Sequence, residues 1–337
     1  MERIREGFYS DKYFVRSREV LRADGHDPRV TMQVTCKTDA FVCGLDEAIA
    51  ILKQCSDDWS ALAVQSLYDG DHAEPWDTVM LIEGPYAAFA PLETLLLGVI
   101  GRRTRICTNT RRVVEAAHSK PVLFFPARHD YWALQPGDGY AARVAGAHAV
   151  STDAQASWWG ECGVGTVPHA LIAAYGGDTV LATCKFAEFA GEGVDVVALV
   201  DYNNDCVGTS LAVARALDGR LWGVRLDTAE NLVDISVLPQ MGQFRPTGVN
   251  AQLVWNVRNA LDTEGFGDVK IIVSGGFDVQ RIRAFEEDGV PVDSYGVGAS
   301  LLEGRFDFTA DVVMVDGRPQ SKVGRALRPN PRLERVR

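Results

Sequence analysis

The chain has 337 residues, which at roughly 150 residues per domain suggests about two domains and a sizeable buried core. With 47% hydrophobic and 23% charged residues it has a globular composition, which excludes a disordered chain. The 34 Lys and Arg against 45 Asp and Glu give a formal net charge of −11, which disfavours a nucleic-acid partner. Any anionic ligand must therefore meet cations that are concentrated at one site.

Cysteine usage and hydropathy indicate the compartment. Seven cysteines without a C-x-x-C pair or regular spacing indicate reduced thiols rather than a disulfide framework. The six histidines form no HExxH or Cys/His ligand set, so we expect no metal held by the protein alone. Residues 1–21 lack the apolar core of a secretory signal, and the most apolar stretch, 84–101, contains Pro85, Pro91 and Glu93. We expect a soluble cytoplasmic protein with no membrane partner.

The first 110 residues show patterns typical of antiparallel strands. The expected strands are 31–44, 60–71 and 77–84, and the expected helix is 46–55. Near the other end, 306–325 holds two short β runs around the turn pair Asp316-Gly317. We interpret this hairpin as the chain returning to its first domain. The last residues, 328–337, are expected to be a loose basic tail.

From Pro121 onward, short apolar runs alternate with amphipathic segments such as 207–219 and 250–265, which is typical of parallel βα units. Seven such units favour a closed or nearly closed α/β barrel. We therefore expect a barrel over 113–304 and a discontinuous domain made of 1–112 and 305–337. The seven apolar runs, each expected to be a strand, are 121–125, 148–151, 179–183, 194–201, 221–227, 269–276 and 292–298.

Polar residues and glycines follow nearly all of these runs, where the chemistry of a parallel α/β barrel collects. Two of the ends, Ser274-Gly275-Gly276 and Gly296-Val297-Gly298, leave backbone N–H groups free of side chains beside the starts of helices. Turns of this kind on adjacent strands form an anion cradle that suits a monophosphate. The alternative is that each glycine serves only a tight turn.

Charged side chains end other runs. Asp201 and Asp227 could bind ribose hydroxyls, hold a magnesium ion or stabilise positive charge on a sugar ring, or each could cap a helix. Arg225 lies two residues before Asp227 and so on the same face of its strand, where the carboxylate would hold it for gripping an anion. His169, in a loop with glycines and a proline, is either a reactive imidazole or a structural histidine.

Motifs in a fixed order along nearly the whole chain carry a resemblance to a known family. They are SDKYFVRSREVL, IEGPYAAFAPLETLLLG, TRICTNTRRVVEAA, PVLFFPARHD, GVGTVPHALI, ALVDYNND, GVRLDTAEN, IIVSGGFD and DSYGVGASL. The chain thereby resembles the nicotinate phosphoribosyltransferases, especially the shorter archaeal and bacterial type, among the type II phosphoribosyltransferases that also act on nicotinamide and quinolinate. The resemblance implies an α/β fold with an N-terminal α/β sandwich domain and an irregular α/β barrel of parallel strands.

The same resemblance implies a reaction and its partners. Nicotinate and phosphoribosyl pyrophosphate would give nicotinate mononucleotide and pyrophosphate, in NAD biosynthesis. ATP would be a co-substrate whose hydrolysis favours product, and Mg²⁺ would be held mainly by the pyrophosphate of the substrate. The enzyme would be a homodimer in which each active site is completed by the N-terminal domain of the partner.

Matching motifs suggest roles for individual residues. Tyr13 would stack on the pyridine ring across the dimer, while Phe125 and Arg128 would stack on and grip the substrate. His169 would take phosphate from ATP. The residues around the ribose, metal and ring would be Asp201, Arg225 and Asp227, and those holding the 5′-phosphate would be Ser274, Gly275, Gly276, Gly296 and Gly298.

The chain departs from the family pattern near the ring pocket. His129 follows Arg128 where many relatives have a second arginine. Asp153 is typical of the branch that uses the amide, whereas the adjacent Ser151 and Thr152 would donate hydrogen bonds to a carboxylate. We therefore expect nicotinate as the substrate, with nicotinamide second. Quinolinate, or a catalytically idle relative that only binds a nucleotide, are the further alternatives.

Overall fold

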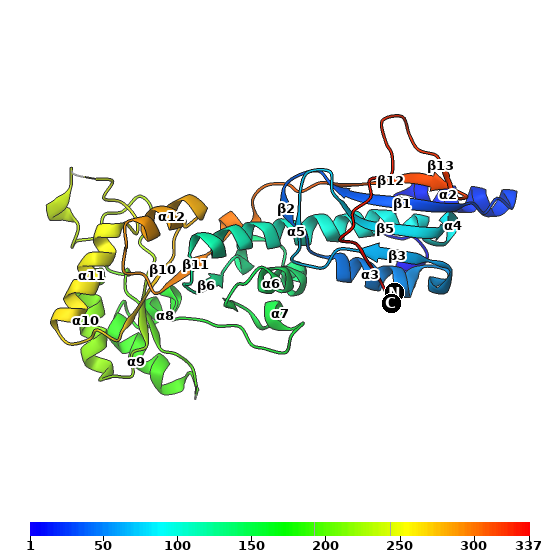
Figure 1. Cartoon of the computed structure of the whole chain (residues 1–337). Coiled ribbons are helices and arrows are strands. Elements are labelled where there is room, and N and C mark those ends of the chain that lie inside the picture. The colour runs from blue at the N-terminus through cyan, green and yellow to red at the C-terminus, as the bar shows by residue number, and fades with distance from the viewer. Residues whose placement is uncertain (192, 243) are drawn as a thin grey trace. The chain divides into compact units, whose positions relative to one another are not determined.

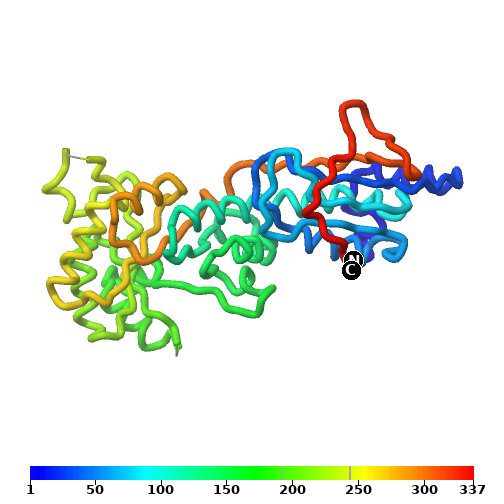
Figure 2. Tube along the Cα trace, in the orientation of Figure 1, coloured from blue at the N-terminus to red at the C-terminus, as the bar shows by residue number. Residues whose placement is uncertain are grey.

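The structure is a computed structural model that describes residues 1–191, 193–242 and 244–337 (Figures 1 and 2). The chain divides into two compact units. One consists of Met1–Asn109 together with Glu303–Arg337, and the other of Thr110–Leu302. No helix within the described residues combines the length and the apolar character that a membrane span requires.

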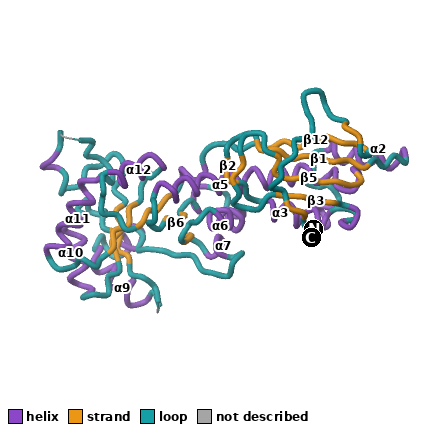
Figure 3. Tube along the Cα trace, viewed as in Figure 1, coloured by secondary structure: helices purple, strands orange, loops and turns teal. Residues whose placement is uncertain are grey.

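The first unit is built on an antiparallel sheet of six strands, ordered β13-β12-β1-β5-β3-β14. Figure 3 shows β12, β1, β5 and β3 side by side in this order. Strand β12 pairs with β1, so the chain returns to this sheet near its C-terminal end. The strands are β1 (Arg29–Cys36), β3 (Ala63–Ser66), β5 (Thr78–Pro85), β12 (Phe308–Val315), β13 (Arg318–Pro319) and β14 (Glu334–Arg335), with a separate pair β2 (Ala40–Phe41) and β4 (His72–Ala73).

Helices pack on the apolar face of this sheet. Met32 and Val34 of β1 lie in one buried cluster with Leu45 and Leu52 of helix α3. The helices are α1 (Glu2–Arg5), α2 (Lys12–Asp24), α3 (Leu45–Cys55), α4 (Tyr86–Phe89) and α5 (Glu93–Ala116), with 3₁₀ turns at Trp59–Ala61 and Ala90–Leu92. A sheet with helices on one face is the α/β sandwich that the sequence predicted.

The second unit is built on a parallel sheet of six strands, ordered β7-β6-β11-β10-β9-β8. It curls as a half-barrel, with α10, α11 and α12 on the outside of its strands (Figure 1). This confirms the irregular α/β barrel of parallel strands, but the sheet is open rather than closed or nearly closed. The strands are β6 (Val122–Phe124), β7 (Ala149–Val150), β8 (Val197–Leu199), β9 (Gly223–Leu226), β10 (Lys270–Val273) and β11 (Ser294–Val297).

The helices of the second unit follow its strands, as βα units require. They are α6 (Gln135–Val144), α7 (Asp153–Ala156), α8 (His169–Ala174), α9 (Thr179–Phe189), α10 (Cys206–Leu217), α11 (Ala251–Thr263) and α12 (Val279–Glu287), with 3₁₀ turns at Ala127–His129, Trp132–Leu134, Leu238–Gln240 and Ala299–Leu302.

One predicted strand is wrong. Residues 179–183 begin helix α9, and the Asp178 carboxylate caps that helix by accepting a hydrogen bond from Leu181 N. A run of five residues with three apolar ones in succession has no periodicity that separates a strand from one and a half turns of helix, so the cap and the continuation to Phe189 decide the structure. The parallel sheet therefore has six strands, and β7 and β8 form its edges.

The prediction of a loose tail is also wrong. Residues 334–335 form β14, which pairs antiparallel with β3, and Val336 N donates to Val64 O at 2.9 Å. Leu333 and Val336 pack against the core of the first unit. Strand β3 would otherwise leave one row of backbone groups unpaired, and the tail satisfies them.

Candidate active site

The carboxyl ends of β8, β9 and β10 lie side by side and bring the predicted charged residues together. Arg225 pairs in register with Leu199 of β8 and Ile272 of β10. Asp201 lies two residues after the end of β8, and Asp227 lies directly after β9. Ser274 lies directly after β10. Because parallel strands end at the same edge of a sheet, these side chains share one region of the second unit.

Asp201 and His169 form a close pair. His169 Nε2 lies 3.1 Å from each carboxylate oxygen of Asp201. The carboxylate is only 8% exposed and the imidazole is 48% exposed. Burial raises the pKa of Asp201, Asp227 adds to that rise, and the neighbouring imidazole opposes it. Because Nε2 faces the carboxylate, Nδ1 is the ring nitrogen left for a reacting group.

Asp201 and Asp227 do not act as helix caps. The cap of α10 is Asp205, whose Oδ1 accepts from Gly208 N at 2.9 Å. Asp227 instead accepts a hydrogen bond of 2.8 Å from Ser274 Oγ. Neither carboxylate is needed to begin a helix, which leaves both for ligands.

Arg225 is a buried cation with spare hydrogen-bonding capacity. Its side chain is 15% exposed, and Nη1 lies 3.8 Å from Asp227 Oδ2 and 3.5 Å from Ser274 Oγ. Its Nε has no hydrogen-bond partner among the described atoms. Burial lowers the pKa of Arg225, Arg128 lowers it further, and Asp227 and Asp201 oppose the shift. An acceptor on an anionic ligand would satisfy this guanidinium.

The turn after β10 has the backbone geometry of an anion cradle. Gly275 and Gly276 have φ values of +82° and +72°, a region that side chains rarely enter. A Cβ on Gly275 would lie 3.3 Å from Asp227 Oδ1. The turn therefore passes directly beside the carboxylate that follows β9.

The other glycine pair has a packing role that sequence reasoning missed. Gly296 lies inside β11, where a Cβ would come 2.8 Å from the ring of Phe125, and a Cβ on Gly298 would come 3.1 Å from the ring of His129. Phe125 N also donates to Val297 O at 2.8 Å. These glycines make room for the two rings, whether or not they also bind phosphate.

The residues predicted around the pyridine ring are partly engaged with one another. Ser151 Oγ donates to Gln155 Oε1 at 3.1 Å. Thr152 Oγ1 caps α7 by accepting from Gln155 N at 3.1 Å and donates to Gln135 Oε1 at 2.8 Å. Asp153 Oδ1 accepts from Gly163 N at 2.9 Å. Both hydroxyls and this carboxylate oxygen already have hydrogen-bond partners within the second unit.

Two further predicted residues carry exposed groups. Arg128 lies in the 3₁₀ turn after β6, with Nε 3.4 Å from His129 Nε2. Tyr13 belongs to the other compact unit, on α2, where it is 60% exposed. The exposed ring leaves Tyr13 free to meet another molecule.

Carboxylates are the potential metal ligands at this edge of the sheet. Asp201 and Asp227 offer oxygens of the kind that Mg²⁺ prefers. Among the residues that the structure describes, no group of three or more His, Cys, Asp or Glu side chains could hold a metal ion. Two carboxylates fit an ion whose other ligands are oxygens of a substrate.

Two residues at the glycine turn were missed by sequence reasoning. Arg281 of α12 donates from Nη1 to the carbonyls of Gly275 and Gly276, at 2.8 and 3.2 Å. Glu230 Oε1 lies so close to Gly276 that a Cβ there would collide with it. Arg281 lies five residues beyond the turn and Glu230 lies on a different loop, so no local motif signals either of them.

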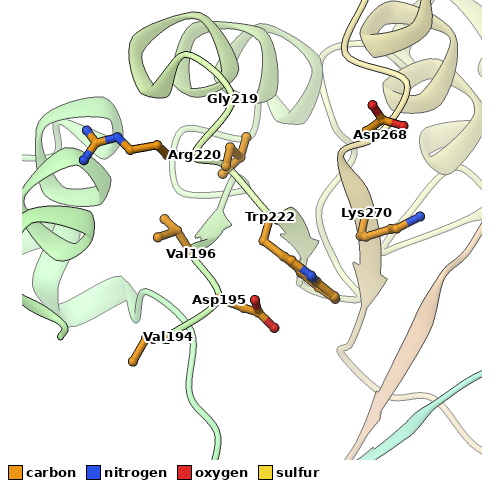
Figure 4. Close-up of a pocket in the computed structure, with 9 residues that line it drawn as sticks. Val194, Asp195, Val196, Gly219, Arg220, Trp222, Asp268 and Lys270 are labelled. Atoms are coloured by element: carbon orange, nitrogen blue, oxygen red, sulfur yellow. The ribbon is translucent and has the colours of Figure 1, made fainter. Parts of the chain in front are cut away.

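A separate cavity lies at the opposite end of the same strands (Figure 4). It has a volume of about 400 Å³ and is lined mainly by residues just before β8 and β9 and at the start of β10. None of its described lining residues belongs to the set predicted from the sequence. We place the candidate active site at the carboxyl ends, because the hydrogen-bonded charged side chains converge there.

Comparisons with known proteins agree on one group. The family model for the quinolinate phosphoribosyl transferase N-terminal domain matches residues 11–104. A nicotinate phosphoribosyltransferase of Mycobacterium tuberculosis is 32% identical over 263 residues, which are 75% of this chain and 54% of that protein. The chain thus spans about half the length of the curated relatives it matches.

Solved structures extend the comparison over the whole chain. The crystal structure of a nicotinate-nucleotide pyrophosphorylase from Pyrococcus furiosus superposes with a TM-score of 0.84 and 32% identity, covering 99% of this chain and 84% of that one. The human nicotinic acid phosphoribosyltransferase, at 16% identity and a TM-score of 0.69, covers 94% of this chain and 77% of its own length. At that identity the human structure supports the fold alone.

Proposed function

We propose that this chain, which belongs to the type II phosphoribosyltransferase family, joins nicotinate to the ribose of phosphoribosyl pyrophosphate. The products are nicotinate mononucleotide and pyrophosphate, and the reaction serves NAD salvage. The observation that carries the proposal is the convergence of Asp201, Arg225, Asp227 and the glycine turn at one sheet edge.

The chemistry needs these groups. The bond between the anomeric carbon and the pyrophosphate oxygen breaks, its electron pair leaves with pyrophosphate, and the pyridine nitrogen lone pair forms the new C–N bond. The ribose carries positive charge between these events, and the carboxylates of Asp201 and Asp227 would stabilise it. Because the ring nitrogen is itself the nucleophile, no protein nucleophile is required at this carbon.

Positioning supplies much of the remaining rate. Arg225 and the Gly275-Gly276 turn would hold the anionic groups of the sugar phosphate. Mg²⁺ bound mainly by the pyrophosphate would neutralise the leaving group, and Asp201 and Asp227 would offer it oxygens. The cations of this acidic chain would thus meet the substrate at one place.

The ring pocket favours an acid over an amide. Phe125 would stack on the pyridine ring and Arg128 would bind its carboxylate. Asp153, the residue that would accept from a carboxamide, already accepts from Gly163 N. Ser151 and Thr152 would reach the substrate carboxylate only by leaving Gln155 and Gln135. Since all three side chains are already engaged, the cation of Arg128, which pairs with an acid and not with an amide, is what supports nicotinate ahead of nicotinamide.

ATP coupling would run through His169. Its ring would attack the terminal phosphorus of ATP, with one P–N bond formed and one P–O bond broken as ADP leaves. Asp201, 3.1 Å from Nε2, would hold the imidazole and balance its positive charge. The working form would be a cytoplasmic homodimer in which the exposed Tyr13 stacks on the ring bound by the partner subunit.

A substrate panel tests this function. The purified chain, with phosphoribosyl pyrophosphate and Mg²⁺, is offered nicotinate, nicotinamide or quinolinate, each with and without ATP. Pyrophosphate release with nicotinate, stimulated by ATP, is expected. Release with another ring alone would reassign the substrate, and no release with any ring would remove the proposed reaction.

A further inference from the structure

Glu230 places a carboxylate directly against the glycine turn at which we propose that a phosphate binds. The residue follows Asp227 by three positions, and its Oε1 lies against Gly276, the second of two left-handed glycines. The missing side chain at Gly276 leaves a space, and this oxygen fills it. The same space lies 3.5 Å from Arg281 Nη1.

One cation, Arg281, lies beside Glu230. Arg281 holds the turn through the carbonyls of Gly275 and Gly276 and also donates to Val249 O. Its guanidinium carbon stacks 4.2 Å from the centroid of the Phe277 ring, which fixes its position. Burial lowers the pKa of Arg281, and the charge of Glu230 is the first of the influences that oppose this shift. The carboxylate therefore lies in the field of a cation that three carbonyl groups and one aromatic ring hold in place.

The backbone beside Glu230 is fixed as well. A Cβ on Gly248 would lie 3.4 Å from the Cα of Glu230, so two loops meet closely at this point. Gly248 N donates to Leu232 O at 2.8 Å, which ties the segment after Glu230 to the same place. The side chain thus reaches the glycine turn from an anchored loop.

We propose that Glu230 is an internal competitor for phosphate, occupying the glycine turn of the free protein and leaving it when a phosphate group binds. The proposal rests on the function proposed above for this turn as the seat of the 5′-phosphate. A carboxylate tethered next to the turn acts at an effective concentration in the millimolar range or above. Every phosphate ligand must displace the same carboxylate at the same cost in free energy, so Glu230 lowers the affinity of the turn for all of them.

Another role for Glu230, as an acceptor for ribose hydroxyls, predicts the opposite sign. A competitor lowers the affinity of the protein for inorganic phosphate and for ribose 5-phosphate by the same factor, because both ligands must displace it. An acceptor for ribose hydroxyls raises the affinity for ribose 5-phosphate and leaves the affinity for inorganic phosphate unchanged. The two roles are therefore separated by comparing these two ligands on the same variants.

Calorimetric titration of the full chain with inorganic phosphate and with ribose 5-phosphate makes this comparison. The variants are Glu230→Gln, which removes the charge, and Glu230→Ala, which also removes the side chain. Glu287→Gln is the matched control, because Glu287 is an exposed acid on α12 of the same unit. We expect both ligands to bind roughly three- to tenfold more tightly to both Glu230 variants, and unchanged to the control.

Each other result has its own meaning. Unchanged phosphate affinity with weaker ribose 5-phosphate binding would overturn the competitor role and leave the proposed function standing. An equal gain in the Glu287→Gln control would reduce the effect to net charge and also overturn it. If neither ligand binds to the unaltered chain or to any variant, the glycine turn is not a phosphate-binding site, and the proposed function is contradicted as well.

Discussion

His169 Nε2 lies 3.1 Å from both carboxylate oxygens of Asp201. The carboxylate is buried by the sheet edge while the imidazole reaches outward. A buried anion that contacts Nε2 fixes the orientation of the ring and leaves Nδ1 for a reacting group. The pair thus links the predicted phosphate acceptor to the predicted ribose site.

Replacing His169 by alanine should separate the two reactions. ADP release should fall to the background rate, because no ring remains to accept phosphate. Transfer without ATP should continue at a measurable rate, because Asp227 and Arg225 stay in place. ADP and pyrophosphate release are measured in parallel, with His26→Ala as control for an exposed histidine on the other unit. Unchanged ADP release in His169→Ala would assign ATP hydrolysis to another group.

Arg225 should be sensitive even to a conservative change. We expect Arg225→Ala to lower kcat/KM for phosphoribosyl pyrophosphate by about 100-fold or more, and Arg225→Lys to recover little, because lysine lacks the planar donor fork. Arg220→Ala is the matched control, since Arg220 lies at the other end of the same strands (Figure 4). Equal losses in the two alanine variants would point to net charge rather than to a site.

Glu93, the first residue of α5, should make stability depend on pH. Burial raises its pKa to about 7 from the usual 4.5, and the charges of Asp311 and Asp11 add to the rise. Between these values the folded chain holds a proton that the unfolded chain has released, so the free energy of unfolding should fall as pH rises. The loss should be on the order of 1 to 2 kcal/mol, after allowance for partial exposure.

Urea unfolding at pH 5 and pH 8 measures this dependence. Glu93→Gln should remove most of the difference between the two pH values, because the amide does not titrate. Glu19→Gln, a change of an exposed acid on α2, should keep the difference. If Glu93→Gln leaves the difference intact, another group carries it.

Gly296→Ala should disturb the ring pocket. The new Cβ would lie 2.8 Å from the Phe125 ring, so the ring must move. We expect a loss of about 1 to 3 kcal/mol in the free energy of unfolding and a higher KM for nicotinate. Gly98→Ala is the control, because a Cβ there meets nothing within 4 Å and helix α5 should gain about 0.5 to 1 kcal/mol. A neutral Gly296→Ala variant would show that the Phe125 ring is not confined.

The sequence predicts elements well where periodicity and turns agree. The six apolar runs that became parallel strands each end in a turn or polar residue, and Asp316-Gly317 predicts the hairpin of β12 and β13. Residues 179–183 show no strand or helix periodicity, and the Asp178 carboxylate caps a helix there by accepting a hydrogen bond from Leu181 N. The strand β14 depends on an unpaired neighbour, β3, which lies about 270 residues earlier and which no local pattern reveals.

The residues of the candidate site also fall into those that the sequence predicts and those that only the fold reveals. Asp201, Arg225, Asp227 and Ser274 are predictable, because strand ends meet at one edge of a parallel sheet. Their partners are not. Arg281 reaches back to the glycine turn from helix α12 and Glu230 reaches it from a separate loop, and only the folded structure places them there.

The most direct measurement of the central claim follows ring-labelled nicotinate into product on the full chain with phosphoribosyl pyrophosphate, Mg²⁺ and ATP. We expect nicotinate mononucleotide and pyrophosphate in equal amounts, with both lost in Asp227→Asn. Pyrophosphate without labelled mononucleotide, or product formation unaffected by Asp227→Asn, would contradict it.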